Sequence, residues 1–125
     1  MARVFLDSNV YFDITKRDKG KLEHLRSDLL FISPLSIHIL FYSYKLKVPD
    51  HEVNEMQELF GIVPLTKSIL DTALDGPTKD LEDNIQLHSA VEAECGLFLT
   101  ADKKLLKMKF FGKARIISEI PPFNP

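Results

Sequence analysis

The sequence predicts an α/β protein, a three-layer sandwich in which helices cover both faces of a central parallel sheet of about five strands. Short apolar runs recur along the chain, and the segments between them carry apolar residues at helical spacing. Strands that alternate with helices are joined by right-handed crossovers, which build a parallel sheet with helices on each side. The 125 residues suffice for one sizeable core, so we expect a single domain spanning residues 1–125.

The expected strands are short runs of apolar residues, several of them β-branched or aromatic. In chain order they are Arg3–Leu6, Leu30–Ser33, Gly61–Leu65, Leu97–Thr100 and Arg115–Ile117. Pro34 directly follows the second run, and Gly96 directly precedes the fourth. Proline and glycine interrupt regular structure, so they mark where these strands stop or start.

Between these runs, apolar residues recur every three or four positions, which is the spacing of an amphipathic helix. In the second such segment, Leu22, Leu25 and Leu29 fall on one stripe. The expected helices are Val10–Lys16, Lys21–Leu30, Leu35–Leu46, Glu52–Phe60, Ser68–Leu74, Leu81–Cys95 and Lys103 to about Met108.

Composition excludes several classes of protein. No stretch approaches the roughly 18 consecutive apolar residues of a membrane-spanning helix, so we expect no membrane association. We expect no secretory-type leader, because Arg3 and Asp7 interrupt the first apolar run. The single cysteine, Cys95, cannot form an intrachain disulfide. Together these features predict a cytoplasmic protein.

Charge is unevenly distributed, although the net charge is only −2. Residues 50–94 contain eleven acidic residues and two lysines, whereas residues 103–115 contain six basic residues and no acidic one. A second basic cluster near the N-terminus consists of Lys16, Arg17, Lys19 and Lys21. Local basic segments can attract a polyanion, and a solvated helix face is an equally good interpretation of runs this short.

Acidic residues lie where expected strands end or helices begin. Asp7 directly follows the first strand, and Asp102 directly precedes the last helix. Asp80 and Asp83 flank the start of the Leu81–Cys95 helix. Taken singly, each favours a structural role: Asp80 and Asp102 are typical N-caps, and Asp7 can accept hydrogen bonds from the turn that follows it.

Taken together, the acidic residues point to a metal site. The carboxyl ends of parallel strands gather at one edge of a sheet, so Asp7, Asp83 and Asp102 meet there if the first and fourth strands are neighbours. Carboxylates packed that closely repel one another. A hard divalent cation such as Mg²⁺ or Mn²⁺ relieves the repulsion, because it prefers oxygen ligands. Such a cation can also activate water for attack on a phosphodiester.

Three segments carry a resemblance to a known family. They are VFLDSNV at residues 4–10, DLEDNIQLHSA at residues 80–90 and FLTAD at residues 98–102. In this order and at these separations they resemble the signature segments of PIN-domain ribonucleases, which include the toxins of VapBC-type toxin–antitoxin pairs. The resemblance spans nearly the whole chain.

The resemblance implies one PIN domain over residues 1–125, with a parallel sheet ordered 3-2-1-4-5. It also implies RNA cleavage that depends on Mg²⁺ or Mn²⁺. Carried over by matching position, Asp7, Asp83 and Asp102 are the catalytic metal ligands. Asp80, one turn before Asp83, is a further candidate ligand.

Other residues of these segments are implied to support the site. Asn9 and Thr100 would hydrogen-bond to the metal ligands. Lys103, Lys104 and Lys107 come directly after the last acidic segment, so we expect them to hold the flanking phosphates of RNA. A small antitoxin protein and a second copy of the chain, in a homodimer, are the protein partners that the resemblance implies.

One position departs from the family pattern. Many PIN nucleases carry a glutamate on the helix after the second strand, where this chain has Ile39. The change removes one oxygen ligand, so the sequence does not decide whether the site binds one metal ion or two. Asp80 or Glu82 is a candidate to replace the missing ligand. Without compensation, the alternative is a PIN fold that has lost catalysis and serves as an RNA-binding or protein-interaction module. A phosphorylatable receiver-like domain is disfavoured, because Asp7 is followed by Ser8 rather than by a second acid.

Overall fold

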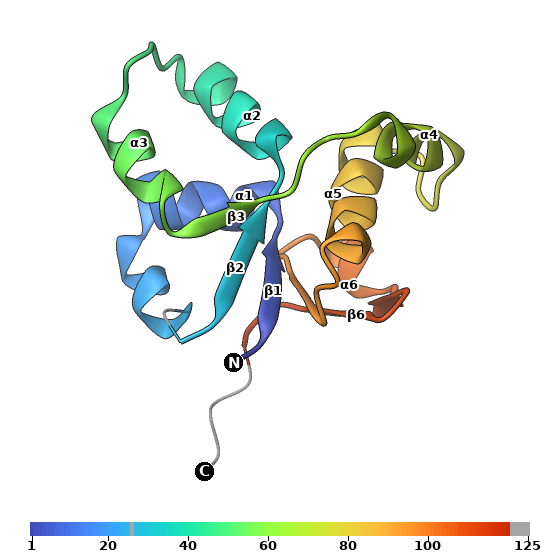
Figure 1. Ribbon diagram of the computed structural model, residues 1–125. Helices are drawn as coiled ribbons and strands as arrows, with labels where there is room; N and C mark the ends of the chain where they lie inside the picture. The colour runs from blue at the N-terminus through green and yellow to red at the C-terminus, as the bar shows by residue number, and fades with distance from the viewer. Residues whose placement is uncertain (26, 121–125) are drawn as a thin grey trace.

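The computed structural model describes residues 1–25 and 27–120, and it has the α/β architecture that the sequence predicts (Figure 1). A six-stranded sheet runs in the order β3-β2-β1-β4-β6-β5. The strands are β1 (Arg3–Leu6), β2 (Leu29–Ile32), β3 (Phe60–Ile62), β4 (Leu97–Leu99), β5 (Phe110–Phe111) and β6 (Ala114–Ile117). Neighbouring strands are parallel except for β5 and β6, which are antiparallel. The five predicted strands are confirmed in the implied order, with β6 as the fifth.

The strand that the sequence did not predict is β5, a two-residue edge strand. It forms a hairpin with β6 in which Phe111 faces Ala114. Gly112 in the turn has a φ of 59°, in the left-handed region that favours glycine. Two residues are too few for an alternating apolar pattern, so the hairpin leaves no strand signal in the sequence.

The described residues form six α-helices. They are α1 (Ser8–Phe12), α2 (Pro34–Tyr44), α3 (His51–Gln57), α4 (Lys67–Asp75), α5 (Leu81–Glu92) and α6 (Lys103–Leu106). A π-helix, η1 (Asp13–Arg17), and a 3₁₀-helix, η2 (Lys19–Leu25), follow α1. The helix predicted over Val10–Lys16 is therefore divided between α1 and η1. Within the described ranges, no helix has the length and apolar character needed to cross a membrane.

The helix predicted over Lys21–Leu30 is wrong in its C-terminal part, where the chain forms β2. Leu29 N donates to Ala2 O at 2.9 Å, and the ladder between β2 and β1 continues from there. Backbone pairing with the central strand outweighs the helical spacing of the leucines, because tertiary contacts routinely override local propensity.

The sheet separates two apolar cores. Helices α1, α2 and α3 pack on one face, and α4, α5 and α6 pack on the other (Figure 1). Successive residues of β1 point to opposite faces, so Val4 and Leu6 belong to one core and Phe5 to the other. Phe5 stacks on Phe98 of β4, with ring centroids 5.6 Å apart. This packing holds β1 and β4 side by side and so positions the residues that follow them.

Candidate functional site

The adjacent ends of β1 and β4 bring Asp7 and Thr100 together. Asp7 is only 4% exposed and directly follows β1. Its Oδ2 accepts a hydrogen bond from Thr100 Oγ1 at 2.7 Å, and its Oδ1 accepts one from Ser8 N at 2.8 Å, which caps α1. Both carboxylate oxygens are thus held in place, and the supporting role predicted for Thr100 corresponds to a direct hydrogen bond.

Thr100 also connects Asp7 to Asp102. Asp102 N donates to Thr100 Oγ1 at 3.0 Å. Asp102 Oδ1 accepts from Lys104 N at 2.8 Å and caps α6, as predicted. Because the threonine hydroxyl accepts from Asp102 and donates to Asp7, the acids that follow β1 and β4 are linked through one side chain.

The third acidic segment reaches the site from α5. Asp80 caps this helix by accepting a hydrogen bond from Asp83 N at 3.0 Å. Asp80, Asp83 and Asp102 line one cleft. The other lining residues are Pro77, Thr78, Lys79, Lys104, Leu105 and Met108. In the part of the chain that the structure describes, the Asp83 carboxylate has no hydrogen-bond or ion-pair partner.

Burial and repulsion from neighbouring acids raise the pKa values of Asp7, Glu82 and Asp83. Burial, followed by the charges of acidic neighbours, raises the pKa of Asp83 from 3.8 to about 6. These neighbours are Asp80, Asp7, Asp102 and Glu82. Burial is also the main cause that raises the pKa of Asp7, and nearby Asp102 and Asp80 add to it. The pKa of Glu82 is raised by burial and then by Asp7 and Asp80. Five carboxylates therefore interact electrostatically, namely those of Asp7, Asp80, Glu82, Asp83 and Asp102.

The chemistry of this donor set fits a hard divalent cation. The five carboxylates supply only oxygen donors, the ligands that Mg²⁺ and Mn²⁺ prefer. As they stand, no three His, Cys, Asp or Glu side chains of the described residues converge closely enough to hold an ion. Hydrogen bonds hold both carboxylate oxygens of Asp7, whereas the Asp83 carboxylate has no such bond among the described residues. Metal binding by Asp7, Asp83 and Asp102 therefore stays a prediction.

The remaining predicted residues are exposed. The Asn9 side chain makes no hydrogen bond within the described residues, and its backbone carbonyl accepts one from Arg17 Nη2 at 2.9 Å. Among the described residues, no hydrogen bond of the Asn9 side chain supports its predicted role in holding the metal ligands. Lys103, Lys104 and Lys107 lie exposed on or just after α6, and Lys104 lines the acidic cleft. Their predicted phosphate contacts remain untested.

A buried polar network lies beside Asp7, close to the place where the family pattern has its helix glutamate. Ile39 packs against the first apolar core. One turn earlier, Ser36 is fully buried and its Oγ lies 3.0 Å from Ser8 Oγ. Gln86 Nε2 donates to Ser8 Oγ at 2.8 Å and to Ser36 Oγ at 3.0 Å. This network is not among the features predicted from the sequence. The sequence feature that could have indicated the network is Gln86, a glutamine that lies three positions after Asp83 on α5 and between two apolar residues.

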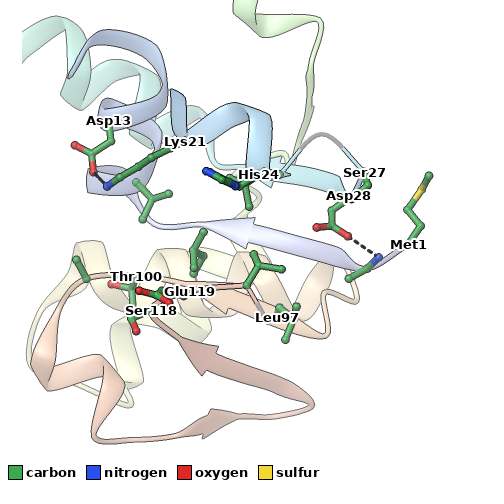
Figure 2. A pocket seen from close by; sticks show the side chains of 16 residues that line it. Met1, Asp13, Lys21, His24, Ser27, Asp28, Leu97, Thr100, Ser118 and Glu119 are labelled. Carbon is green, nitrogen blue, oxygen red and sulfur yellow. Dashed lines mark hydrogen bonds and ion pairs between the residues drawn. The ribbon is translucent and has the colours of Figure 1, made fainter. Parts of the chain in front are cut away.

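A second cavity lies beside η2 and contains none of the carboxylates of the acidic cleft (Figure 2). Asp13 and Lys21 form an ion pair there at 2.6 Å, and Asp28 Oδ1 accepts a hydrogen bond from Ala2 N at 3.1 Å. Thr100 also lines this cavity, but its hydroxyl is engaged at the end of β1. The acidic cleft, not this cavity, carries the candidate chemistry.

Comparison with known proteins agrees with the geometry. The sequence model of the PIN domain matches residues 4–111. The fold is similar to that of a chain in the crystal structure of VapBC2 from Rickettsia felis bound to a DNA fragment from their promoter, with a TM-score of 0.66 and 14% sequence identity. That match covers 92% of this chain and 97% of the other. No curated protein matches the chain.

Proposed function

The chain belongs to the PIN-domain family, and from this premise we propose that it is a metal-dependent endoribonuclease built as one domain over residues 1–125. We also propose that it is the toxin of a toxin–antitoxin pair. The observation that carries the activity is the cleft lined by Asp80, Asp83 and Asp102, which interact electrostatically with Asp7. A divalent cation bound there would relieve the repulsion among these carboxylates.

In this proposal, Asp7, Asp83 and Asp102 hold Mg²⁺ or Mn²⁺, and Asp80 is a further candidate ligand. When bound, such an ion lowers the pKa of an attacking water and offsets charge on the departing oxygen. Thr100 orients Asp7 through the 2.7 Å hydrogen bond to its Oδ2. Outer hydrogen bonds of this kind fix the direction in which a ligand presents its free lone pairs.

Substrate binding is assigned to the basic residues that follow Asp102. Lys104 lines the cleft, and Lys103 and Lys107 lie exposed close to it in sequence. These lysines would hold phosphates on either side of the cleaved bond. Such contacts position a strand without reading its sequence, and they weaken as salt rises. The preference for RNA over DNA rests on the family alone.

The proposed partners follow from analogy. The similar VapBC2 structure is a complex bound to promoter DNA, and a small antitoxin partner for this chain is proposed on that ground. Homodimerisation is proposed from the family. A cytoplasmic location suits Cys95, which is buried and unpaired. A small DNA-binding protein encoded beside this chain would support the toxin role.

Cleavage of a single-stranded RNA oligonucleotide, with Mg²⁺ or Mn²⁺ and with or without EDTA, tests the activity. The parent protein should cleave with either ion and stop in EDTA. Asp83→Asn should be inactive, whereas the matched variant Asp75→Asn, on the exposed surface of α4, should cleave like the parent. Full activity in EDTA, or in Asp83→Asn, would falsify the assignment.

Ile39 and the open arrangement of the carboxylates support a second candidate function, a PIN fold that binds RNA or protein without cutting. This candidate predicts RNA binding without cleavage at any Mn²⁺ concentration. It also predicts that Asp83→Asn leaves RNA affinity unchanged. Gel-shift and cleavage assays on the same oligonucleotide separate the two functions.

A further inference from the structure

We propose that α6 and the hairpin of β5 and β6 bind the part of a single-stranded RNA that extends from the acidic cleft, with Phe110 stacked on a base and the basic residues around it holding phosphates. The inference rests on the proposed function for the identity of the ligand, and it adds a binding surface to that function. The hairpin surface, as we call it, consists of Phe110 and the six basic residues Lys103, Lys104, Lys107, Lys109, Lys113 and Arg115.

The basic side chains of the hairpin surface are not neutralised by the protein. All six are exposed, and residues 103–115 contain no acid. Within the described ranges, none of the six forms an ion pair or a side-chain hydrogen bond. In the other basic cluster, by contrast, Lys16, Lys19 and Lys21 each pair with an acid. Unpaired positive charge on the surface is available to neutralise phosphates, and counterions are released when it does so.

Phe110 is exposed because of the side of the sheet that it faces. Phe111, the next residue, packs against the second core, so Phe110 points to the opposite face. Phe110 lies opposite Arg115 in the ladder between β5 and β6, and Arg115 pairs in turn with Leu97 of β4. Helices α1, α2 and α3 do not cover the outer end of this row, since Phe110 is 59% exposed and Arg115 is exposed as well. An aromatic ring and a guanidinium are therefore neighbours on an open part of the sheet.

The ring of Phe110 has no partner in the part of the chain that the structure describes. No other aromatic ring packs on it, and no arginine or lysine lies over it. Bases of any identity stack on such a ring, while basic residues beside it hold the adjoining phosphates. The bases of a duplex are already stacked on one another, so an exposed ring selects an unpaired base. The combination favours a single strand.

The hairpin surface is continuous with the acidic cleft. Lys104 and Met108 line the cleft. Phe110 follows Met108 by two residues, so their Cα atoms are at most about 7 Å apart. Lys107 and Lys109 lie on either side of Met108 in sequence. A strand that enters the cleft can therefore extend along α6 to the hairpin.

A strand of another protein chain fits this edge less well. β5 is the edge strand of the sheet, but it is only two residues long. Lys109 precedes it, and Lys113 follows in the turn. Short edge strands flanked by lysine discourage pairing with a further strand. The hairpin thus offers little backbone for pairing, whereas its side chains offer a ring and positive charge.

Binding of the full chain to a fluorescent single-stranded RNA of about 12 nucleotides tests the proposal, measured by anisotropy in EDTA to prevent metal-dependent cleavage. Phe110→Ala and Phe110→Leu should each raise Kd about 10-fold, the usual loss of one stacked base, whereas Phe110→Trp should bind at least as tightly as the parent. Tyr42→Ala is the matched control, because Tyr42 is an 81% exposed aromatic residue on α2, and it should leave Kd unchanged. Parent-like binding by Phe110→Ala or by Phe110→Leu would overturn the stacking role.

Salt dependence separates the charges from the ring. The slope of the logarithm of the binding constant against the logarithm of salt concentration should be unchanged in Phe110→Ala. It should be about 0.7 smaller in magnitude in Lys109→Gln and in Lys113→Gln, because each loses one phosphate contact with a single strand. Lys67→Gln should keep the parent slope, since Lys67 is exposed and pairs with Asp71 on α4. Equal slopes for all three lysine variants would overturn the phosphate contacts.

A duplex of the same sequence is the control for base stacking. Phe110→Ala should bind this duplex like the parent, and equal losses on duplex and single strand would contradict recognition of an unpaired base. Sedimentation of Phe110→Ala covers the remaining occupant. A change of oligomeric state with unchanged RNA affinity would overturn the proposal and identify the hairpin surface as a contact between copies of the chain.

The proposed function has a separate readout. Cleavage of the same oligonucleotide in Mn²⁺ tests the acidic cleft, whereas the titration in EDTA tests the hairpin surface. RNA binding that depends on Phe110, without cleavage in Mn²⁺, would support the inference and remove the nuclease activity. Cleavage that is lost in Asp83→Asn, together with parent-like binding by Phe110→Ala, would remove only the inference.

Discussion

The region around η1 and α3 and the acidic cleft at the start of α5 place carboxylates in opposite electrostatic settings. In the first region, Glu52 pairs with Lys16 at 2.8 Å and also with Lys19, and Asp50 pairs with Lys16 at 3.3 Å. Hydrogen bonds to Lys16 and Lys19 lower the pKa of Glu52, and a backbone hydrogen bond from Val53 is the main cause that lowers that of Asp50. At the cleft, burial and repulsion instead raise the pKa values of Asp83 and of nearby Asp7.

The difference shows which acids serve the fold. The basic cluster near the N-terminus, one of two candidates for attracting a polyanion, is largely neutralised: Lys16, Lys19 and Lys21 each pair with an acid. Paired charges of this kind connect η1, η2 and α3. Asp7 and Asp83 reduce folding stability when they are ionised, because burial and the charges of neighbouring acids oppose their ionised form. Buried acids with raised pKa values are typical of a functional site that binds a ligand.

The largest expected contrast is between two Asp→Asn variants. Asp7→Asn should lower the rate of RNA cleavage by at least about 100-fold, because it removes a predicted ligand, while Asp50→Asn should leave the rate unchanged. Thermal melting should show that both variants stay folded. Equal activity of the two would remove the distinction between a paired acid and a functional one.

Next in size is the effect of the cation on stability. At about 100 times its Kd, an ion that binds only the folded state adds about 2.7 kcal/mol, which raises Tm by roughly 10 °C in a domain of this size. Mn²⁺ should raise the Tm of the parent and of Glu52→Gln by this amount. A similar rise in Asp83→Asn would place the ion outside the cleft.

The pH dependence of stability should have opposite sign in the two regions. The folded pKa of Asp83, about 6, lies above its ordinary value of 3.8, so ionisation opposes folding and the penalty grows as pH rises from about 4 to above 6. Asp83→Asn should therefore be more stable than the parent at pH 7.5 by about 1 kcal/mol, after allowance for solvent screening, and equal to it at pH 4. Urea denaturation without metal measures both values.

Among basic residues, one that lines the cleft should differ from one that is ion-paired. Lys104→Gln should raise KM for RNA about 3-fold at low salt, because one phosphate contact is lost, and the difference should shrink as salt is added. Lys19→Gln is the matched variant in the ion-paired region and should leave KM unchanged. If both variants raise KM equally, the effect depends only on net charge, and Lys104 has no specific role in RNA binding.

The smallest effect is expected for Glu52→Gln, which should lower Tm slightly at pH 7, because ion pairs that remain partly open to solvent contribute little. The pKa of Glu52 lies below its ordinary value of 4.5, so the stability it adds is present above that pH and is lost as pH falls through the lowered pKa. Tm values at pH 7 and pH 3 measure this loss. A rise in Tm at pH 7 would show that Glu52 resembles the acids of the cleft.

Local signals predicted much of the fold and part of the site. Apolar runs located β1, β2, β3, β4 and β6, and residue chemistry identified Asp80 and Asp102 as helix caps. The errors fall where local and distant forces compete, as at Leu29, which has helical spacing but pairs with β1. Ser36 and Gln86 were missed because an isolated polar residue has no recognisable pattern until its distant partner is known.

The sequence by itself determined the alternation of strands and helices and the acidic residues at the ends of β1, β4 and the loop before α5. Periodicity and capping act within a few residues, so they can be recognised along the chain. The family resemblance implied that β1 and β4 are neighbours, and the structure confirms it. Only the tertiary structure decided that Thr100 bridges Asp7 and Asp102, and which acids are paired. Burial and Coulomb interactions depend on distance in space, and residues far apart in sequence set them.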